Sequence, residues 1–235
     1  DIVGLGQRAE VANFTRGSGG ISTKAIRESY VARLMGDFRS VKGLKVAWDA
    51  GNGALGPAMT QLTSCLPGVH ILLNEEVNGD FPAHHPDPTI PENLIQLQEI
   101  VRKEKCDLGI AFDGDGDRIG VVDGLGRILW GDQILAILAR DMLEELPGAT
   151  IIADVKASQA LFDEVTRLGG HPVMSPTGHS VIKSKMAELK APLAGEMSGH
   201  IFFADRYYGY DDALYAALRL VDIVARADNS LATMR

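Results

Sequence analysis

The feature that most limits how this chain can fold is an alternation of short β-rich runs with longer amphipathic runs, and the alternation occurs twice. The first half predicts strands at 44–48, 69–73, 107–112 and 119–123, with helices at 57–65 and 91–104. The second half predicts strands at 150–153, 171–174, 191–195 and 201–203, with helices at 133–145, 158–168, 180–189 and 211–227. Strands that alternate with helices form βαβ units around parallel sheets. We therefore predict an α/β fold of two tandem domains with mixed, mostly parallel sheets.

Domain boundaries follow from the places where this alternation stops. The Gly-rich quartet at 124–127 predicts a hinge, so we expect one domain at 26–126 and a second at 127–235. Residues 1–25 show weak periodicity and a Gly/Ser-rich patch, which predicts a connector from a further, missing domain. A length of 235 residues suits two domains of common size.

Composition narrows the possible partners. With 46% hydrophobic and 23% charged residues, the chain can bury a sizeable core. A net charge of -8 argues against nucleic acid, which attracts basic surfaces. No apolar run approaches the roughly 20 residues of a membrane span, and we see no signal peptide. Cys65 and Cys106 lack metal-type spacing, so we predict a cytoplasmic protein with two reduced thiols.

The sharpest local feature is an acidic loop that directly follows the predicted strand at 107–112. Asp113, Asp115 and Asp117 alternate with glycines that allow a tight turn, so their carboxylates can converge. Such carboxylates repel one another unless a cation lies between them, and an all-oxygen site favours Mg²⁺ or Ca²⁺. An EF-hand is excluded, because its sixth and twelfth positions would be Arg118 and Gly124. A solvated acidic turn without a ligand is the alternative to a metal site.

The position of this loop and the residue Arg118 add a phosphate ligand to the hypothesis of a metal site. Open α/β sheets bind ligands beyond the carboxyl ends of their strands, where the acidic loop is expected. The guanidinium of Arg118 offers a fork of donors suited to a phosphate oxygen.

A second loop, Gly195–His200, follows the predicted strand at 191–195. If it is extended, Glu196, Ser198 and His200 face one side and offer an acceptor, a hydroxyl and an imidazole to neighbouring sugar hydroxyls. The spacing differs from the GxSxG of a hydrolase nucleophile. A purely structural turn is the alternative.

A third, glycine-rich segment at 51–56 matches GxGxxG after a strand, which is the form of a dinucleotide-binding turn. A dinucleotide-binding domain stays as a further alternative, but it would leave the acidic loop and the loop at 195–200 unexplained.

The two loops together resemble the α-D-phosphohexomutase superfamily, in its phosphomannomutase/phosphoglucomutase type. Its second domain carries a DGDGDR metal loop and its third a GEMSGH sugar loop, as at 113–118 and 195–200 here. Further matching segments are 49–53, 79–82, 84–88, Lys156 and 177–180. The resemblance covers the chain from about Tyr30 onward and implies two phosphohexomutase-type α/β domains.

The resemblance implies an isomerase of carbohydrate metabolism that interconverts hexose 1-phosphate and 6-phosphate, with mannose or glucose as the sugar. A phosphoserine and a bisphosphorylated sugar carry the phosphoryl group. It implies Mg²⁺ on Asp113, Asp115 and Asp117, and a catalytic role for Arg118 beside the transferring group. The remaining implied residues are Glu196 and Ser198 on the sugar, His200 as general acid/base and substrate contact, and Lys156 and His179 as peripheral substrate contacts.

The family's phosphoserine loop and its C-terminal phosphate-binding loop do not occur in this sequence. We therefore expect the chain to be the central fragment of a mutase, inactive without domains 1 and 4. A non-catalytic sugar-phosphate-binding module and a metal-dependent phosphatase stay as alternatives. Adjacent His84 and His85 point apart on an extended chain, so they are poor joint metal ligands.

Overall fold

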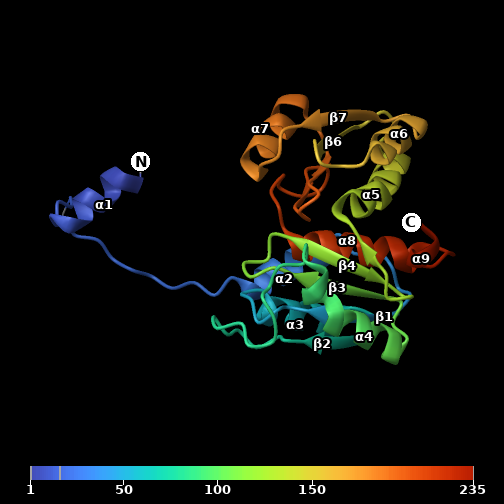
Figure 1. Ribbon diagram of the computed structural model, residues 1–235, viewed down its shortest axis with the longest axis horizontal. Helices are drawn as coiled ribbons and strands as arrows, with labels where there is room; N and C mark the ends of the chain where they lie inside the picture. The colour runs from blue at the N-terminus through green and yellow to red at the C-terminus, as the bar shows by residue number, and fades with distance from the viewer. Residues whose placement is uncertain (1, 16, 235) are drawn as a thin grey trace.

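A computed structural model describes residues 2–15 and 17–234, and it confirms an α/β fold built on two mixed sheets (Figure 1). The first sheet has the strand order β2-β1-β3-β4-β5 and the second the order β7-β6-β8-β9. The strands are β1 Leu44–Asp49, β2 Gly68–Leu73, β3 Leu108–Phe112, β4 Ile119–Asp123, β5 Ile128–Leu129, β6 Thr150–Asp154, β7 His171–Ser175, β8 Leu193–Gly195 and β9 Ile201–Phe203.

The two sheets share one plan. In the first, β1 pairs in parallel with β2 and β3, and β4 then runs antiparallel to β3. In the second, β6 pairs in parallel with β7 and β8, and β9 runs antiparallel to β8. The acidic loop joins β3 to β4 and the loop at 196–200 joins β8 to β9, so the two loops hold equivalent positions in the two sheets.

Helices cover both faces of each sheet. The helices of the described residues are α1 Ile2–Glu10, which packs on neither sheet, α2 Arg27–Met35, α3 Gly56–Cys65, the 3₁₀ turn η1 Pro91–Leu94, α4 Ile95–Glu104, α5 Gly131–Glu145, α6 Gln159–Arg167, α7 His179–Leu189, α8 Ala213–Arg226 and α9 Leu231–Met234. We call the sheet β2-β1-β3-β4-β5 with the helices packed on it the first lobe, and the sheet β7-β6-β8-β9 with its helices the second lobe. In the first lobe α4 packs on one face, while α3 and α8 pack on the other. In the second lobe α7 packs on one face, and α5 and α6 on the other.

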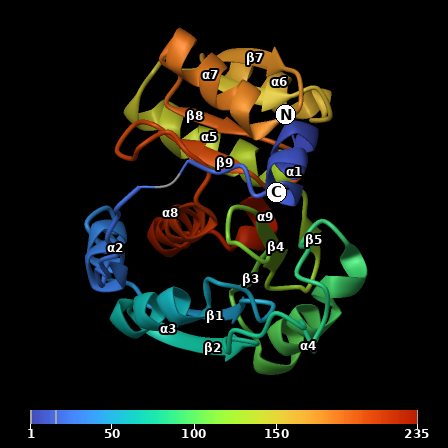
Figure 2. The ribbon, with the colours of Figure 1, turned by 90° about the vertical axis from the view of Figure 1, so that its left-hand side faces the viewer.

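Helix α8 ties the two lobes together. It lies between them in both ribbon views (Figures 1 and 2), although it belongs to the second half of the sequence. Its apolar side chains join one continuous core with β3, β4, β9 and α5, and Leu214, Leu218 and Leu220 are fully buried there. Because a close-packed interior resists deformation, this shared core holds the two hairpin loops at a set separation.

Residues 124–127, where we predicted a hinge, form the tight turn between β4 and β5 of one sheet. The Asp123 carboxylate accepts the N–H groups of Leu125 and Arg127, and Gly126 N–H donates to the Asp123 carbonyl. Glycines that we took for flexibility serve here to close a hydrogen-bonded turn.

Two other predicted segments also differ from the structure. The predicted connector at 1–25 contains α1, a helix whose residues are all outside the core and which lies away from both lobes in Figure 1. The helix predicted from Pro91 begins as the 3₁₀ turn η1 and becomes α-helical only at Ile95. Within the described residues, no helix combines the length and the apolar character needed to cross a membrane.

Candidate functional site

The acidic loop turns around one buried carboxylate. Asp113 is 2% exposed, and its Oδ1 accepts N–H bonds from Gly116, Asp117 and Arg118 at 3.0, 3.0 and 3.1 Å. Gly116 has a φ of +83°, a left-handed conformation that glycine adopts without strain. The loop is therefore closed largely by hydrogen bonds to its own first residue, Asp113. This explains why the six residues 113–118 are enough to specify the conformation of the loop.

The three aspartates predicted as metal ligands come together. One carboxylate oxygen of each of Asp113, Asp115 and Asp117 lies within 4.8 Å of the other two. Asp113 is buried, Asp117 is half-buried and Asp115 is exposed, so the group opens toward solvent on one side. This arrangement could bind a metal ion.

The electrostatics of the cluster suit a cation. Burial and the nearby charges of Asp113 and Asp115 raise the pKa of Asp117 to about 6, although His200 acts in the opposite sense. Burial would also raise the pKa of Asp113, but hydrogen bonds from Arg118 and the loop outweigh it and hold that pKa below its usual range. The loop itself thus stabilises the negative charge of Asp113. A second negative charge, on Asp117, is disfavoured.

Arg118 lies beside the cluster and is restrained by two carboxylates. Its Nε donates to Asp113 Oδ2 at 2.8 Å, and one terminal nitrogen lies 3.2 Å from Asp87 Oδ1. Asp87 belongs to the long loop before η1 and also accepts two bonds from Thr89. The sequence analysis did not single out Asp87, because only the fold brings it to Arg118.

The loop at 196–200 is a tight turn, and the extended conformation assumed from the sequence was wrong. Glu196 N–H donates to the His200 carbonyl, and Gly199 N–H donates to the Glu196 carbonyl. Side-chain alternation therefore does not apply, yet Ser198 Oγ still donates to Glu196 Oε2 at 3.0 Å. Glu196 is buried, and its other oxygen accepts the Gly178 N–H at 2.8 Å.

The two hairpin loops touch directly. Ile119 N–H donates to the Gly199 carbonyl at 3.0 Å, and the backbones of Arg118 and His200 pair as an isolated antiparallel bridge. Gly199 has a φ of +95°, and a Cβ built on it would lie 2.5 Å from the Ile119 carbonyl oxygen. Glycine is required here for both its conformation and its size, and it allows the acidic loop and the second loop to meet.

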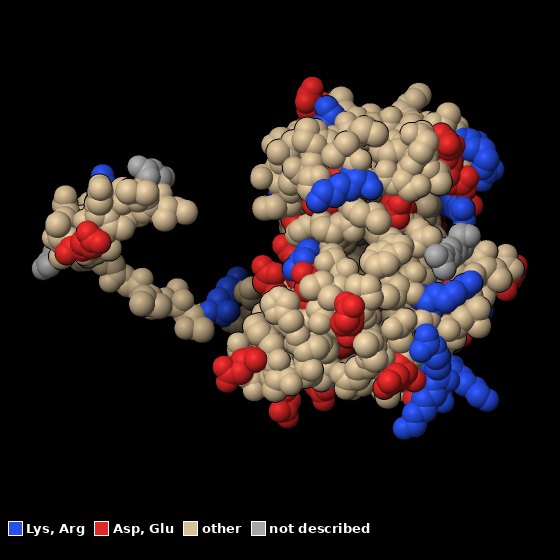
Figure 3. Space-filling view, in the orientation of Figure 1, with Lys and Arg blue, Asp and Glu red and all other residues tan. Residues whose placement is uncertain are grey.

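His200 extends the site from the second lobe to the aspartates. Its Nδ1 lies 3.0 Å from Asp211 Oδ2 and 3.7 Å from Asp117 Oδ2. Burial would lower its pKa, but the carboxylates of Asp211, Asp117 and Glu196 outweigh that effect and raise it. Space-filling atoms in Figure 3 show Asp and Glu side chains, with basic ones beside them, at the boundary between the lobes.

The two residues predicted as peripheral contacts differ in position. His179 begins α7, and its ring stacks on His200 with a centroid separation of 5.8 Å. Lys156 lies exposed in the turn after β6.

Two further acidic residues, Asp154 and Asp211, support the second loop, and no local pattern in the sequence pointed to either. Buried Asp154, at the carboxyl end of β6, accepts the Met197 N–H and the Thr177 hydroxyl, both at 3.2 Å. Asp211 pairs with Lys183 at 3.0 Å in addition to His200. Their neighbours come from separate elements, so only the folded chain identifies them.

The glycine-rich turn at 51–56 supports the acidic loop. Ala54 N–H donates to the Gly114 carbonyl, and Asn52 N–H donates to the Asn74 carbonyl, so these amides are engaged within the protein. Nearby His84 Nε2 contacts buried Asp49 Oδ2 at 2.9 Å. The contacts favour a structural role for the turn and for His84.

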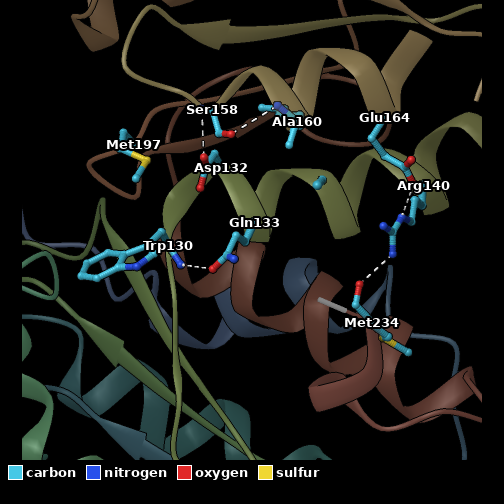
Figure 4. Close-up of a pocket in the computed structure, with 11 residues that line it drawn as sticks. Trp130, Asp132, Gln133, Arg140, Ser158, Ala160, Glu164, Met197 and Met234 are labelled. Carbon is cyan, nitrogen blue, oxygen red and sulfur yellow. Dashed lines mark hydrogen bonds and ion pairs between the residues drawn. The ribbon is translucent and has the colours of Figure 1, made fainter. Parts of the chain in front are cut away.

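A cavity of about 410 Å³ lies next to the second loop, between α5 and α6 (Figure 4). Met197 at the tip of the loop and Trp130 border it, and Asp132 there accepts the Ser158 N–H at 2.9 Å. Arg140 pairs with Glu164 and with the Met234 carbonyl. The charged groups of this mostly apolar cavity are already paired, and the carboxylate cluster lies elsewhere.

Family models match both lobes. Residues 28–126 match the phosphoglucomutase/phosphomannomutase alpha/beta/alpha domain II, and residues 130–235 match domain III of the same family.

Individual relatives agree with this match. A phosphomannomutase/phosphoglucomutase of Pseudomonas aeruginosa is 45% identical over 225 residues, which is 96% of this chain and 49% of the relative. A phosphoglucomutase of Neisseria gonorrhoeae is 42% identical over 90% of this chain and 46% of its own length. A crystal structure of a phosphoglucomutase/phosphomannomutase family protein from Burkholderia thailandensis superposes with a TM-score of 0.92 at 45% identity, covering 99% of this chain and 51% of that one. The chain spans about half the length of the relatives it matches.

Proposed function

Because this chain belongs to the phosphoglucomutase/phosphomannomutase family and carries its domains II and III, we propose that it is the central part of a mutase that moves phosphate between C1 and C6 of a hexose. The phosphoryl group passes from a phosphoserine to the sugar, through a bisphosphorylated intermediate. Relatives of twice the length, named for this activity on mannose and glucose phosphates, support the proposal.

One observation carries the proposal. The Ile119–Gly199 hydrogen bond joins the carboxylate cluster to the loop with Glu196 and Ser198, across the boundary between the lobes. A hexose phosphate bound there would have its phosphoryl group beside the cluster and its hydroxyls beside the second loop.

We assign Mg²⁺ to Asp113, Asp115 and Asp117. The oxygen-only set and the raised pKa of Asp117 fit a hard divalent ion. When bound, this ion stabilises negative charge on phosphoryl oxygens. Arg118 supplies further donors toward the same oxygens, and its bonds to Asp113 and Asp87 hold the guanidinium in place.

The second loop binds the sugar in this proposal. Glu196 and Ser198 accept and donate hydrogen bonds to ring hydroxyls, with Glu196 oriented by the Gly178 N–H. His200 is the general acid/base, since the unperturbed pKa of an imidazole lies near neutrality and an imidazole can therefore both accept and donate a proton. His179 and the exposed Lys156 contact substrate at the periphery.

The most direct test compares this chain with a longer protein that carries all four domains. We expect purified 1–235, free of host mutase, to bind Mg²⁺ and to give no conversion of glucose 1-phosphate to glucose 6-phosphate. We expect the longer protein to convert it, and to stop when Mg²⁺ is chelated. Turnover by 1–235 alone would contradict the assignment as a partial enzyme, and an inactive longer protein would contradict the mutase.

Two alternatives make different predictions in the same experiment. A metal-dependent phosphatase would release inorganic phosphate from either hexose phosphate, whereas a mutase releases none. A sugar-phosphate-binding module would show saturable binding of glucose 1-phosphate to 1–235, with no product. A cytoplasmic location stays a prediction.

A further inference from the structure

One ring nitrogen of His200 has two carboxylates close to it and no hydrogen bond. Its Nδ1 lies 3.0 Å from Asp211 Oδ2 and 3.7 Å from Asp117 Oδ2. The Nδ1 atom is buried, and no group among the described residues makes a hydrogen bond with it. Buried polar atoms normally have a partner, so this nitrogen calls for an explanation.

The three groups around this nitrogen converge in the way that the ligands of a metal ion do. One ligand atom of each of Asp117, His200 and Asp211 lies within 4.8 Å of the other two. Zn²⁺ holds nitrogen and oxygen ligands at about 2.0–2.2 Å in a tetrahedron, which places the ligand atoms about 3.3–3.6 Å apart. The separations of 3.0 and 3.7 Å from Nδ1 lie on either side of that range. A cation between the three groups would give Nδ1 its partner.

Two of these ligands are oriented by groups outside the cluster. Lys183 Nζ lies 3.0 Å from Asp211 Oδ1, which leaves Oδ2 directed at His200. The backbone of Asp211 pairs with Phe202 of β9, and the ring of Phe202 stacks on His200 with a centroid separation of 6.3 Å. Metal sites depend on such surrounding contacts, because these contacts fix the direction in which each ligand points.

The kind of ligand separates this group from the acidic loop. Asp113, Asp115 and Asp117 offer oxygen alone, which suits Mg²⁺, whereas the second group includes an imidazole, which suits Zn²⁺ and other transition metals. Asp117 belongs to both groups, and the two oxygens of one carboxylate can bind two ions. Two-metal sites of this kind hold their ions about 3.5–4 Å apart.

We propose that Asp117, His200 and Asp211 form a second cation site, which prefers Zn²⁺ to Mg²⁺ and at which Zn²⁺ inhibits the enzyme. An ion on Nδ1 uses the only lone pair of the neutral ring, so His200 can no longer accept a proton. The inhibition rests on the proposed function, in which His200 is the general acid/base. The binding of Zn²⁺ does not rest on it.

Zn²⁺ binding can be measured in the wild-type 235-residue chain, with Mg²⁺ present in excess. Calorimetry gives the affinity, and NMR of ¹⁵N-labelled histidine distinguishes a metal-bound ring nitrogen from a free one. We expect Zn²⁺ to bind and the Nδ1 resonance of His200 to become that of a metal-bound nitrogen. Absence of binding, or a His200 ring that is unchanged when Zn²⁺ saturates the chain, would overturn the proposal whether or not any variant folds.

Two variants distinguish this site from the acidic loop. We expect Asp211→Asn to lower Zn²⁺ affinity by at least about 10-fold and to leave Mg²⁺ affinity little changed, because groups that merely orient ligands are already worth about 10- to 100-fold. Asp115→Asn should do the reverse, since Asp115 belongs to the acidic loop alone. Asp228→Asn, at an exposed position, is the matched control for both. Zn²⁺ affinity that falls with Asp115→Asn and not with Asp211→Asn would place Zn²⁺ in the acidic loop and contradict the proposal.

The longer protein supplies the test of inhibition. There we expect Zn²⁺ to stop the conversion of glucose 1-phosphate in excess Mg²⁺, and a chelator selective for Zn²⁺ to restore it. Asp211→Asn should raise the inhibiting Zn²⁺ concentration by at least about 10-fold, in parallel with the loss of affinity. Full activity at a Zn²⁺ concentration that saturates His200 would overturn the inhibitory role. An inactive wild-type enzyme would instead sink the proposed function and leave the binding result standing.

Discussion

The acidic loop and the loop at 196–200 occupy equivalent hairpins in the two sheets, but they are stabilised in opposite ways. The acidic loop is closed from within, because the carboxylate of Asp113 accepts three N–H groups of its own loop. The second loop is held from outside by Asp154, the Gly178 N–H, Asp211 and Ile119. A loop closed from within can be recognised in sequence, whereas a loop held from outside takes its geometry from the fold. The predictions below test this difference and run from the largest to the smallest effect on stability.

Asp113→Asn should cost the most stability. It removes the charge that accepts three loop N–H groups and pairs with Arg118, and it leaves Arg118 without its closest partner. Breaking a buried ion pair on one side typically costs about 3–5 kcal/mol. Urea unfolding of 1–235 measures the loss, with exposed Asp163→Asn as the control. A loss below about 1 kcal/mol would show that the acidic loop does not depend on its internal carboxylate.

Gly199→Ala should weaken the contact between the two loops. It should cost less stability than Asp113→Asn. The added Cβ would crowd the Ile119 carbonyl and would strain a residue at φ +95°. We expect a loss of about 1–3 kcal/mol. Amide exchange should also quicken at Ile119, whose N–H bonds to the Gly199 carbonyl. Gly148, with a φ of +80° and open space around it, provides the control Gly148→Ala for strain without crowding. Equal losses at both positions would argue that the loops do not meet as described.

Stabilisation by Mg²⁺ should depend on pH through Asp117. Its pKa of about 6 in the folded chain lies above the value near 3.8 of an ordinary aspartate, so the folded state binds more protons than the unfolded one. Without the ion, this group therefore costs stability as the pH rises from about 4 to about 6. A cation replaces the proton, so the rise in Tm caused by Mg²⁺ should be larger at about pH 7.5 than at about pH 5. An equal rise at both pH values would count against Asp117 as a ligand.

Much of the fold could be predicted because its signals are local. The patterns that predicted the strand at 44–48 and the helix at 57–65 lie within those residues, and both elements appear within one residue of the predicted ends. The acidic loop was recognised for the same reason. The tight turn at 124–127 was not predicted, since glycine marks both a hinge and a tight turn, and only the pairing of β5 with β4 shows that a turn forms here.

The second loop shows where local signals end. Glu196, Ser198 and His200 were singled out from the sequence, and Ser198 Oγ does donate to Glu196, yet the conformation of the loop depends on Gly199 meeting Ile119 from the other lobe. Asp211 was taken simply as the start of the last helix, although Asp212 caps that helix and Asp211 faces His200. His200 and Asp211 are eleven positions apart in the sequence, and a contact at that separation produces no periodic pattern from which it could be predicted.

Asp115→Asn should separate cation binding from folding most cleanly. Asp115 is the exposed member of the cluster, and the N–H groups of the loop bond to Asp113 instead, so its charge does not hold the loop closed. We expect unfolding free energy to change by less than about 0.5 kcal/mol, as for other exposed substitutions. Calorimetry should nevertheless show Mg²⁺ affinity reduced by at least about 10-fold, because one of three charged ligands is lost. A large loss of stability would mean that the loop is closed by mutual contacts of all three aspartates. Unchanged affinity would mean that the ion, if it binds, is held by Asp113 and Asp117 with a partner from the second lobe, and the contrast between the two loops would then have to be withdrawn.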